Sequence, residues 1–136
     1  MLLRSYTMGL AEGFAGLDNI LTYDTSGEQK GFFAILAELR AQRFDLAIVS
    51  HPTFRIAVLM YCAGVPVRVG SGYRWYSFLF NRKVFEHRKT AEKHEAEYNI
   101  SLLQVIGLAA PEVPRVALAI PESSKSAAAA EIRRLG

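Results

Sequence analysis

The feature that most constrains the fold is an apolar run, Phe44–Ser50, which lies between two helix patterns. Its centre is continuously apolar, which is typical of a strand buried on both faces of a parallel sheet. The helix pattern before it spans Lys30–Arg43; the one after it spans Phe54–Ala63 and is ended by Gly64 and Pro66. Another short strand pattern follows at once. This order, with tight connections, predicts right-handed βαβ units.

We therefore expect an α/β fold with a mainly parallel sheet and flanking helices. Five segments have strand patterns: residues 1–5, 19–23, 45–50, 66–69 and 116–120. Three further segments have helix patterns: Thr7–Phe14, Thr90–Ile106 and Ser126–Leu135. In the Lys30–Arg43 helix, the apolar stripe that should face the core consists of Phe32, Phe33, Leu36, Ala37 and Leu39.

Composition excludes several classes of protein. The chain has 136 residues, 51% of them hydrophobic, which fits one globular domain and argues against a disordered chain. The single cysteine, Cys62, excludes an internal disulfide and fits a helix face in the core. No apolar run reaches the roughly 18–20 residues of a membrane span, and the N-terminus does not resemble a signal peptide. We expect a cytoplasmic protein.

Basic residues gather in one part of the chain. Between Arg68 and Lys93 there are seven basic residues and two acidic ones, Glu86 and Glu92, so this stretch is more positive than the chain as a whole, whose net charge is +3. The basic residues are Arg68, Arg74, Arg82, Lys83, Arg88, Lys89 and Lys93. Such a cluster suits an anionic partner. The alternative is a solvated surface whose aliphatic stems pack on aromatic rings.

Three polar residues, His51, Thr53 and Arg55, follow the central strand pattern. Because ligands of open α/β sheets bind outside the carboxyl ends of the strands, these residues are placed to line a crevice, although a His-Pro turn can also be purely structural. No phosphate-binding glycine loop, nucleophile elbow or metal-ligand spacing is present, so we expect neither a metal nor a cofactor. The residues alone predict a binding surface without visible catalytic machinery.

Four segments together resemble glycosyltransferase family 9, the ADP-heptose:lipopolysaccharide heptosyltransferases. These are Phe44–Arg55, Ala63–Gly70, Leu79–Lys83 and Lys93–Leu103. Their order and spacing carry the resemblance, which covers roughly residues 1–107. It implies the N-terminal, acceptor-binding half of a GT-B fold, with a Rossmann-like sheet over residues 1–110 and a bridge over residues 111–136 toward a nucleotide-sugar domain.

The resemblance also implies an activity: inverting, metal-independent transfer of heptose from ADP-heptose to the lipopolysaccharide inner core, at the surface of the inner membrane. The family's first strand and the loop aspartate thought to act as base would precede Met1, and the nucleotide-sugar domain would follow Gly136. We therefore expect a fragment or a truncated reading frame that is inactive by itself, with its catalytic base unassigned. Without its first strand, the sheet should expose an apolar edge at which two copies pair.

Carried over by position, the resemblance places several residues against the anionic acceptor. Together with the residues after the central strand, the expected acceptor-binding set is His51, Thr53, Arg55, Arg74, Arg82, Lys83 and His94. His51-Pro52 stands where the family more often has Gln-Gly, which leaves the identity of the acceptor open.

A second hypothesis is a small basic module that binds nucleic acid or another polyanion through its aromatic loop, Tyr73–Lys83. Trp75, Phe78 and Leu79 have helical spacing, which favours packing in the core or in a loop over display on a sheet face. We therefore favour the transferase and expect no nucleic-acid partner.

Overall fold

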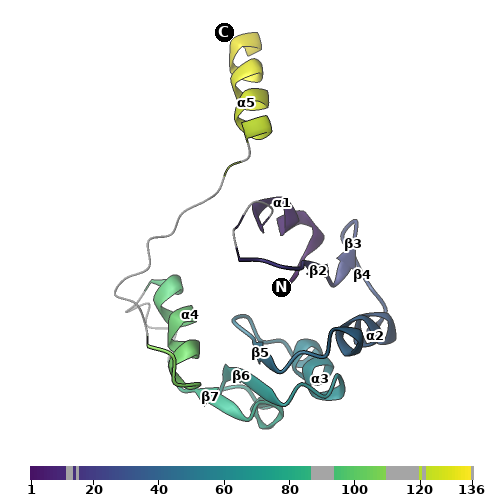
Figure 1. Ribbon diagram of the computed structural model, residues 1–136, viewed down its shortest axis with the longest axis vertical. Coiled ribbons are helices and arrows are strands. Elements are labelled where there is room, and N and C mark those ends of the chain that lie inside the picture. The colour runs from purple at the N-terminus through teal and green to yellow at the C-terminus, as the bar shows by residue number, and fades with distance from the viewer. Residues whose placement is uncertain (12–13, 15, 87–93, 110–119, 121, 136) are drawn as a thin grey trace. The chain divides into compact units, whose positions relative to one another are not determined.

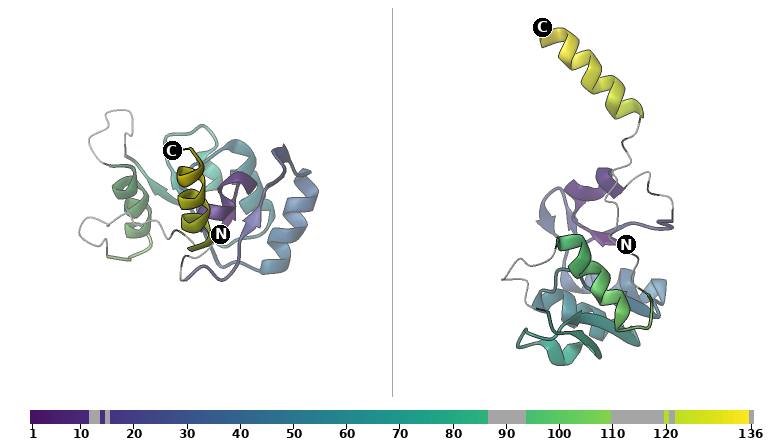
Figure 2. Two further views of the ribbon diagram at one scale, coloured as in Figure 1. Left: turned by 90° about the horizontal axis from the view of Figure 1, so that it is seen from above. Right: turned by 90° about the vertical axis from the view of Figure 1, so that its left-hand side faces the viewer.

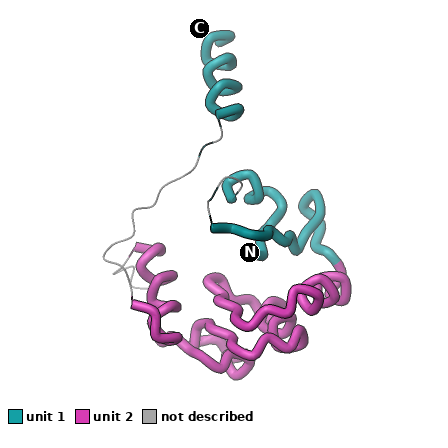
Figure 3. Tube along the Cα trace, viewed as in Figure 1, with its two compact units in different colours: residues 1–30, 117–136 teal, residues 31–116 magenta. Residues whose placement is uncertain are grey.

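The computed structural model describes residues 1–11, 14, 16–86, 94–109, 120 and 122–135. The chain forms two compact units, residues 31–116 and residues 1–30 together with 117–136 (Figure 3). Among the described residues, no helix is both long enough and apolar enough to cross a membrane.

The unit of residues 31–116 is built on a parallel sheet of three strands (Figure 1). Its strands are β5 (Leu46–Ile48), β6 (Val67–Ser71) and β7 (Arg82–Val84), in the order β5-β6-β7. Val69 pairs with Ile48 on one side and with the first residue of β7 on the other. The predicted α/β fold with a parallel sheet is confirmed. β7 was not predicted.

Three helices flank this sheet: α2 (Phe32–Gln42), α3 (Phe54–Cys62) and α4 (Glu95–Gln104). α2 packs against α3, whereas α4 lies against β7, so α2 and α4 stand at opposite ends of this unit (Figures 1 and 2). All three helices were predicted, α2 and α4 from their periodicity and α3 from the residues at its two ends. The predicted residues 90–93 of the last helix lie outside the described part of the chain.

The core corrects two expectations. α2 buries Ile35, Leu36 and Leu39, whereas Phe33 is 80% exposed. At 100° per residue, Phe33 lies about 200° around the helix from Ile35, so it points away from the core. The strand β5, which was predicted to be buried on both faces, has one of its side chains, Ile48, 39% exposed. In the described sheet β5 is an edge strand with a neighbour on one side only. Whether this edge pairs two copies stays a prediction.

The other unit contains two short pairs of strands. β1 (Leu2–Leu3) and β2 (Leu21–Thr22) are parallel, and they lie within the strands predicted at residues 1–5 and 19–23. β3 (Asp24–Thr25) and β4 (Glu28–Gln29) form an antiparallel hairpin. The sequence indicated only a turn here, and the residues between the two strands do adopt the positive φ angles that such a turn requires.

The helices of this unit follow the predicted pattern. A 3₁₀ turn, η1 (Ser5–Thr7), leads into α1 (Met8–Ala11), and the C-terminal helix α5 spans Glu122–Leu135. The predicted strand at residues 116–120 lies almost wholly outside the described residues, and Ile120 itself is not in a strand.

Asp24, the first residue of β3, connects the hairpin to Ser5 near the start of the chain by hydrogen bonds. Its two carboxylate oxygens accept hydrogen bonds from the Ser5 backbone N–H at 2.7 Å and from the Ser5 hydroxyl at 2.8 Å. These bonds, the backbone N–H first, lower the pKa of the Asp24 carboxyl, against the opposing effect of its burial. The ionised carboxylate therefore stabilises the folded state.

A depressed pKa sets the pH dependence of this contribution. It is fully present above the carboxyl's unfolded pKa of about 4, and it is lost as the pH falls through the lower folded-state pKa. We expect Asp24→Asn to lower the melting temperature at neutral pH and to reduce the acid-induced loss of stability. Thermal unfolding followed by circular dichroism at several pH values measures both effects. Equal acid sensitivity in the two proteins would contradict this assignment.

Candidate functional site

A pocket of about 760 Å³ opens where the three parallel strands end. The carboxyl ends of parallel strands meet at the same edge of a sheet, and the residues after β5, β6 and β7 all contribute to the lining. The lining residues are Val49, Ser50, His51, Pro52, Ser71, Tyr73, Arg74, Val84, Glu86, Glu95, Tyr98 and Leu102. Of the three residues that the strand-end rule placed at a crevice, His51 lines this pocket, whereas Thr53 and Arg55 do not.

The lining combines an apolar wall with four ionisable side chains. Tyr98 and Leu102, both buried, supply part of the wall from α4. The ionisable residues are His51, Arg74, Glu86 and Glu95. His51 and Arg74 were predicted from the sequence, whereas the two glutamates were not. Among the described lining residues, one guanidinium and two carboxylates give the pocket mixed charge.

Glu86 is positioned by α4. The Ser101 hydroxyl lies 3.1 Å from Glu86 Oε1 and 3.1 Å from the backbone carbonyl oxygen of Glu97. Ser101 is buried, so this contact fixes the carboxylate at the pocket wall. Glu86 follows β7 in the chain, and its place in the pocket could have been anticipated only if β7 had been recognised as a strand.

His94 positions α4 rather than lining the pocket. Its Nδ1 accepts a hydrogen bond from the Ala96 backbone N–H at 3.2 Å. Its own backbone N–H donates to Glu97 Oε2 at 2.6 Å, which completes a capping box. This N-terminal cap begins the helix that carries Glu95 into the pocket. The acceptor-binding role expected for His94 stays a prediction.

Arg74 reaches the pocket from the loop after β6. The buried Tyr76 anchors this loop by donating a hydrogen bond from its hydroxyl to the Pro52 carbonyl oxygen at 2.7 Å. The Ser77 backbone N–H donates to the Arg74 carbonyl oxygen at 2.8 Å and closes a turn within the loop. A fixed loop can hold a guanidinium at a pocket with little loss of entropy on binding.

Arg68 has structural contacts in the described part of the chain. Its Nε donates to the Leu79 carbonyl oxygen at 2.8 Å, and its Nη1 donates to the Val65 carbonyl oxygen. Its guanidinium also lies over the Tyr61 ring, 5.2 Å from the centroid. At Arg68 the contacts fit the alternative interpretation of the basic stretch, because two of its guanidinium nitrogens donate to backbone carbonyls and the guanidinium packs on an aromatic ring.

The other predicted acceptor residues lie outside the pocket lining. Arg82 begins β7, at the end of the strand away from the pocket, and Lys83 follows it inside the strand. Thr53 caps α3 by accepting a hydrogen bond from the Ile56 backbone N–H at 3.3 Å, and Arg55 lies in the first turn of that helix. Their acceptor contacts stay predictions. The remaining basic residues of the stretch, Arg88, Lys89 and Lys93, lie outside the described residues.

The aromatic loop is packed only in part. Leu79 is buried as predicted, but Trp75 is 73% exposed and Phe78 is 68% exposed. The Trp75 ring stacks on Phe54, with ring centroids 4.8 Å apart and an interplanar angle of 28°. The helical spacing of these aromatics therefore did not predict burial, since the loop contains only one 3₁₀ turn, η2 (Ser77–Leu79).

Within the described parts of the chain, no group of three His, Cys, Asp or Glu side chains is arranged to hold a metal ion. The expected independence from metals and cofactors stays a prediction.

Comparisons with known proteins agree with this geometry. The sequence model of glycosyltransferase family 9, the heptosyltransferase family, matches residues 32–134. A protein of Haemophilus influenzae (strain Rd) named "Putative glycosyltransferase" is 29% identical over 103 residues, which is 76% of this chain and 30% of that protein. The chain thus spans under a third of the length of this relative. No solved structure matches the chain significantly. With the family model covering the whole pocket-bearing unit from α2 onward, the chain belongs to glycosyltransferase family 9.

Proposed function

We propose that this chain is the acceptor-binding part of an inverting GT-B glycosyltransferase that transfers heptose from ADP-heptose to the inner core of lipopolysaccharide. The observation that carries the proposal is the pocket at the strand ends, which brings Arg74 and His51 together with two carboxylates. We place the acceptor saccharide in this pocket.

The lining suits a hydroxylated ligand that also carries an anionic group. The carboxylates of Glu86 and Glu95 are strong acceptors for sugar hydroxyl donors, whereas the Arg74 guanidinium suits a carboxylate or phosphate. Among the described lining residues, a bare polyanion such as nucleic acid would meet the carboxylates of Glu86 and Glu95 as well as the Arg74 guanidinium. The mixed charge therefore favours the transferase over the nucleic-acid module.

In this proposal, residues 1–110 belong to the acceptor-binding domain, and residues 111–136 lead toward the domain that binds the nucleotide sugar. The share of the relative's length that the chain covers, 30%, supports a division of substrates between this part and others. Arg55, Arg82 and Lys83 would attract the anionic acceptor from outside the pocket. The catalytic base is not assigned to any described residue.

Substitution of the pocket arginine tests the proposal. We expect Arg74→Ala to weaken binding of a soluble, phosphorylated, Kdo-bearing inner-core saccharide about tenfold or more, because one charge-assisted hydrogen-bonding group is lost. Adding Arg82→Ala and Lys83→Ala should weaken it further. Isothermal titration calorimetry on the full chain measures the affinity.

The matched control is Arg133→Ala, which removes the same charge from the exposed surface of α5. It should leave the affinity unchanged. The triple variant should stay within about 1 kcal/mol of the parent in free energy of unfolding, since surface charges contribute little. If the triple variant unfolds, these residues have a structural role. If Arg74→Ala binds the saccharide as tightly as the parent does, the saccharide does not bind in this pocket.

A further inference from the structure

The two carboxylates of the described pocket lining differ in their surroundings. Glu95 lies in the first turn of α4 and is exposed. Glu86 is half-buried, and its Oε1 lies 3.1 Å from the hydroxyl of the buried Ser101. A hydrogen bond to a half-buried charge is stronger than one at the surface, because the local dielectric is lower and water competes less. Of the two carboxylates, Glu86 is therefore better suited to discriminate between ligands.

Ser101 brings a hydroxyl to the buried face of α4. Tyr98, Ser101 and Leu102 are buried, and their spacing of three and four places them on one face of the helix. The hydroxyl has one hydrogen to donate, and two acceptors lie 3.1 Å away, Glu86 Oε1 and the Glu97 carbonyl oxygen. A bond to an ionised carboxylate is about twice as strong as a neutral one, so we assign the hydrogen to Glu86. Ser101 thus holds the Glu86 carboxylate from the side of α4.

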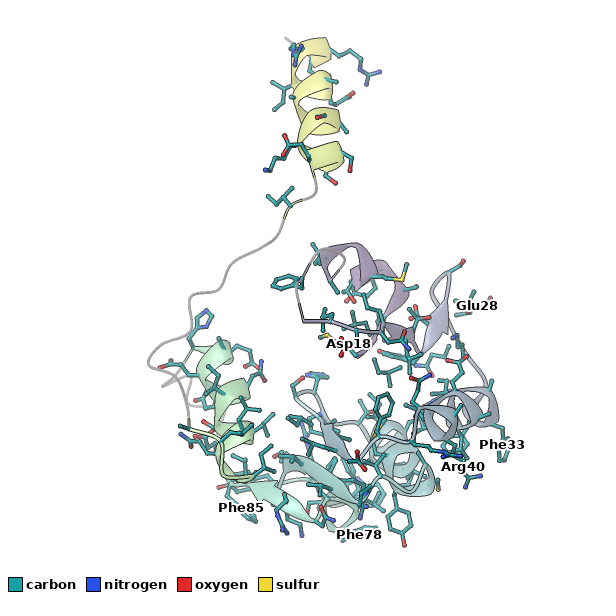
Figure 4. The ribbon with its side chains drawn as sticks, viewed as in Figure 1. Asp18, Glu28, Phe33, Arg40, Phe78 and Phe85 are labelled. Carbon is teal, nitrogen blue, oxygen red and sulfur yellow. The ribbon has the colours of Figure 1, made fainter. Side chains whose placement is uncertain are left out.

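The strand end that precedes Glu86 is held by the segment that follows β6. The Gly72 backbone N–H donates a hydrogen bond to the Val84 carbonyl oxygen at 2.9 Å. The Phe85 ring lies directly on Gly72 and leaves no room there for a Cβ. Phe85 lies on the side of this unit that carries α4, opposite Phe33 of α2 (Figure 4). Glu86 therefore extends from a fixed backbone, and its side chain is fixed by α4.

We propose that Glu86 is a specificity-determining residue of the pocket and that Ser101 is its positioning residue. The Glu86 carboxylate accepts a hydrogen bond from a sugar hydroxyl and repels an anion that brings no hydroxyl, while the Arg74 guanidinium binds the anionic group. A ligand that carries both groups satisfies both side chains, whereas a bare anion is attracted by one and repelled by the other. This inference rests on the proposed function, because it takes a saccharide as the ligand of the pocket.

Removal of the charge at nearly constant shape tests Glu86. We expect Glu86→Gln to weaken binding of the soluble inner-core saccharide about fivefold or more, because a charge-assisted hydrogen bond becomes a neutral one. It should strengthen binding of inorganic sulfate, which carries charge but no hydroxyl, about threefold or more. Isothermal titration calorimetry on the full chain measures both affinities, with sodium chloride at equal ionic strength as the blank for sulfate. Glu28→Gln in the exposed strand β4 is the matched control and should change neither affinity.

A double substitution tests Ser101. Ser101→Ala should weaken saccharide binding about threefold, because the carboxylate loses its donor, and Ser101→Thr should restore most of the affinity, because threonine keeps the hydroxyl. In a chain that already carries Glu86→Ala, Ser101→Ala should cause no further loss, since no carboxylate remains to be positioned. Equal losses in both backgrounds would show that Ser101 acts on α4 as a whole and would overturn its positioning role. Ser124→Ala, on the exposed surface of α5, is the control for loss of a helical serine.

The outcomes separate this inference from the proposed function. If Arg74→Ala weakens saccharide binding but Glu86→Gln changes neither affinity, the pocket binds the saccharide and Glu86 does not select it, which overturns the inference alone. If Arg74→Ala leaves saccharide binding unchanged, the proposed function fails, and the sulfate titration still shows whether Glu86 excludes bare anions. Weaker sulfate binding in Glu86→Gln would contradict that exclusion. Circular dichroism checks that each variant is folded, and where an alanine variant is not, the shape-preserving Glu86→Gln decides.

Discussion

Replacing Phe80 with Ala should lower the free energy of unfolding by about 3–5 kcal/mol, the range for removing a fully buried phenyl ring. Phe80 is 1% exposed and is the largest of the fully buried side chains. It lies against β6 at Gly70, where an added Cβ would come within 2.8 Å of the ring. The loss would be a large part of the roughly 5–15 kcal/mol that stabilises a typical domain. Urea unfolding followed by circular dichroism measures it.

The same ring type two residues earlier provides the control. Phe78 is exposed, so Phe78→Ala should change the free energy of unfolding by no more than about 0.5 kcal/mol. If Phe80→Ala leaves no folded protein, Phe80→Leu supplies a smaller and measurable loss. Comparable losses at positions 78 and 80 would show that the loop does not pack as described.

The parts of the fold set by local rules were predictable. α3 begins at the capping residue Thr53 and ends before Gly64, whose φ of 79° requires glycine, as its sequence pattern indicated. β7 was missed because two of its three residues are the cations Arg82 and Lys83, and its strand geometry comes from pairing with β6 rather than from an apolar run. Strands of this kind are decided by tertiary contacts.

The pocket was predictable to the extent that it depends on strand ends. His51 was found because it follows the central strand, and Arg74 was found from the basic stretch together with the resemblance. Glu86 could not be found without β7. Glu95 was not singled out because the helix was predicted to begin at Thr90, so its place in the first turn of α4 was not expected. The two carboxylates of the described lining thus come from the fold and could not be inferred from the number of basic residues in this stretch.

Arg68 contacts the backbone of the fold, whereas Arg74 lines the pocket, so the two basic residues should respond differently to substitution. We expect Arg68→Ala to lower the free energy of unfolding by about 2–3 kcal/mol, because its guanidinium donates to the carbonyl oxygens of Leu79 and Val65 and lies over Tyr61. These contacts join the start of β6 to the segments on either side of it. Removal of the side chain would leave two partly buried carbonyl groups without their charged donor.

Arg68→Lys should recover less than half of this loss, because an ammonium group cannot reproduce the planar fork that reaches two carbonyls at once. The control is Arg82→Ala, which removes an exposed guanidinium. Its one hydrogen bond to a described residue is long, 3.3 Å, to the neighbouring Asn81 carbonyl oxygen. It should cost at most about 0.5 kcal/mol. At a temperature where Arg68→Ala is still folded, its affinity for the inner-core saccharide should equal that of the parent. A weakened affinity with unchanged stability would make Arg68 a binding residue and restore the basic stretch as one continuous ligand-facing cluster.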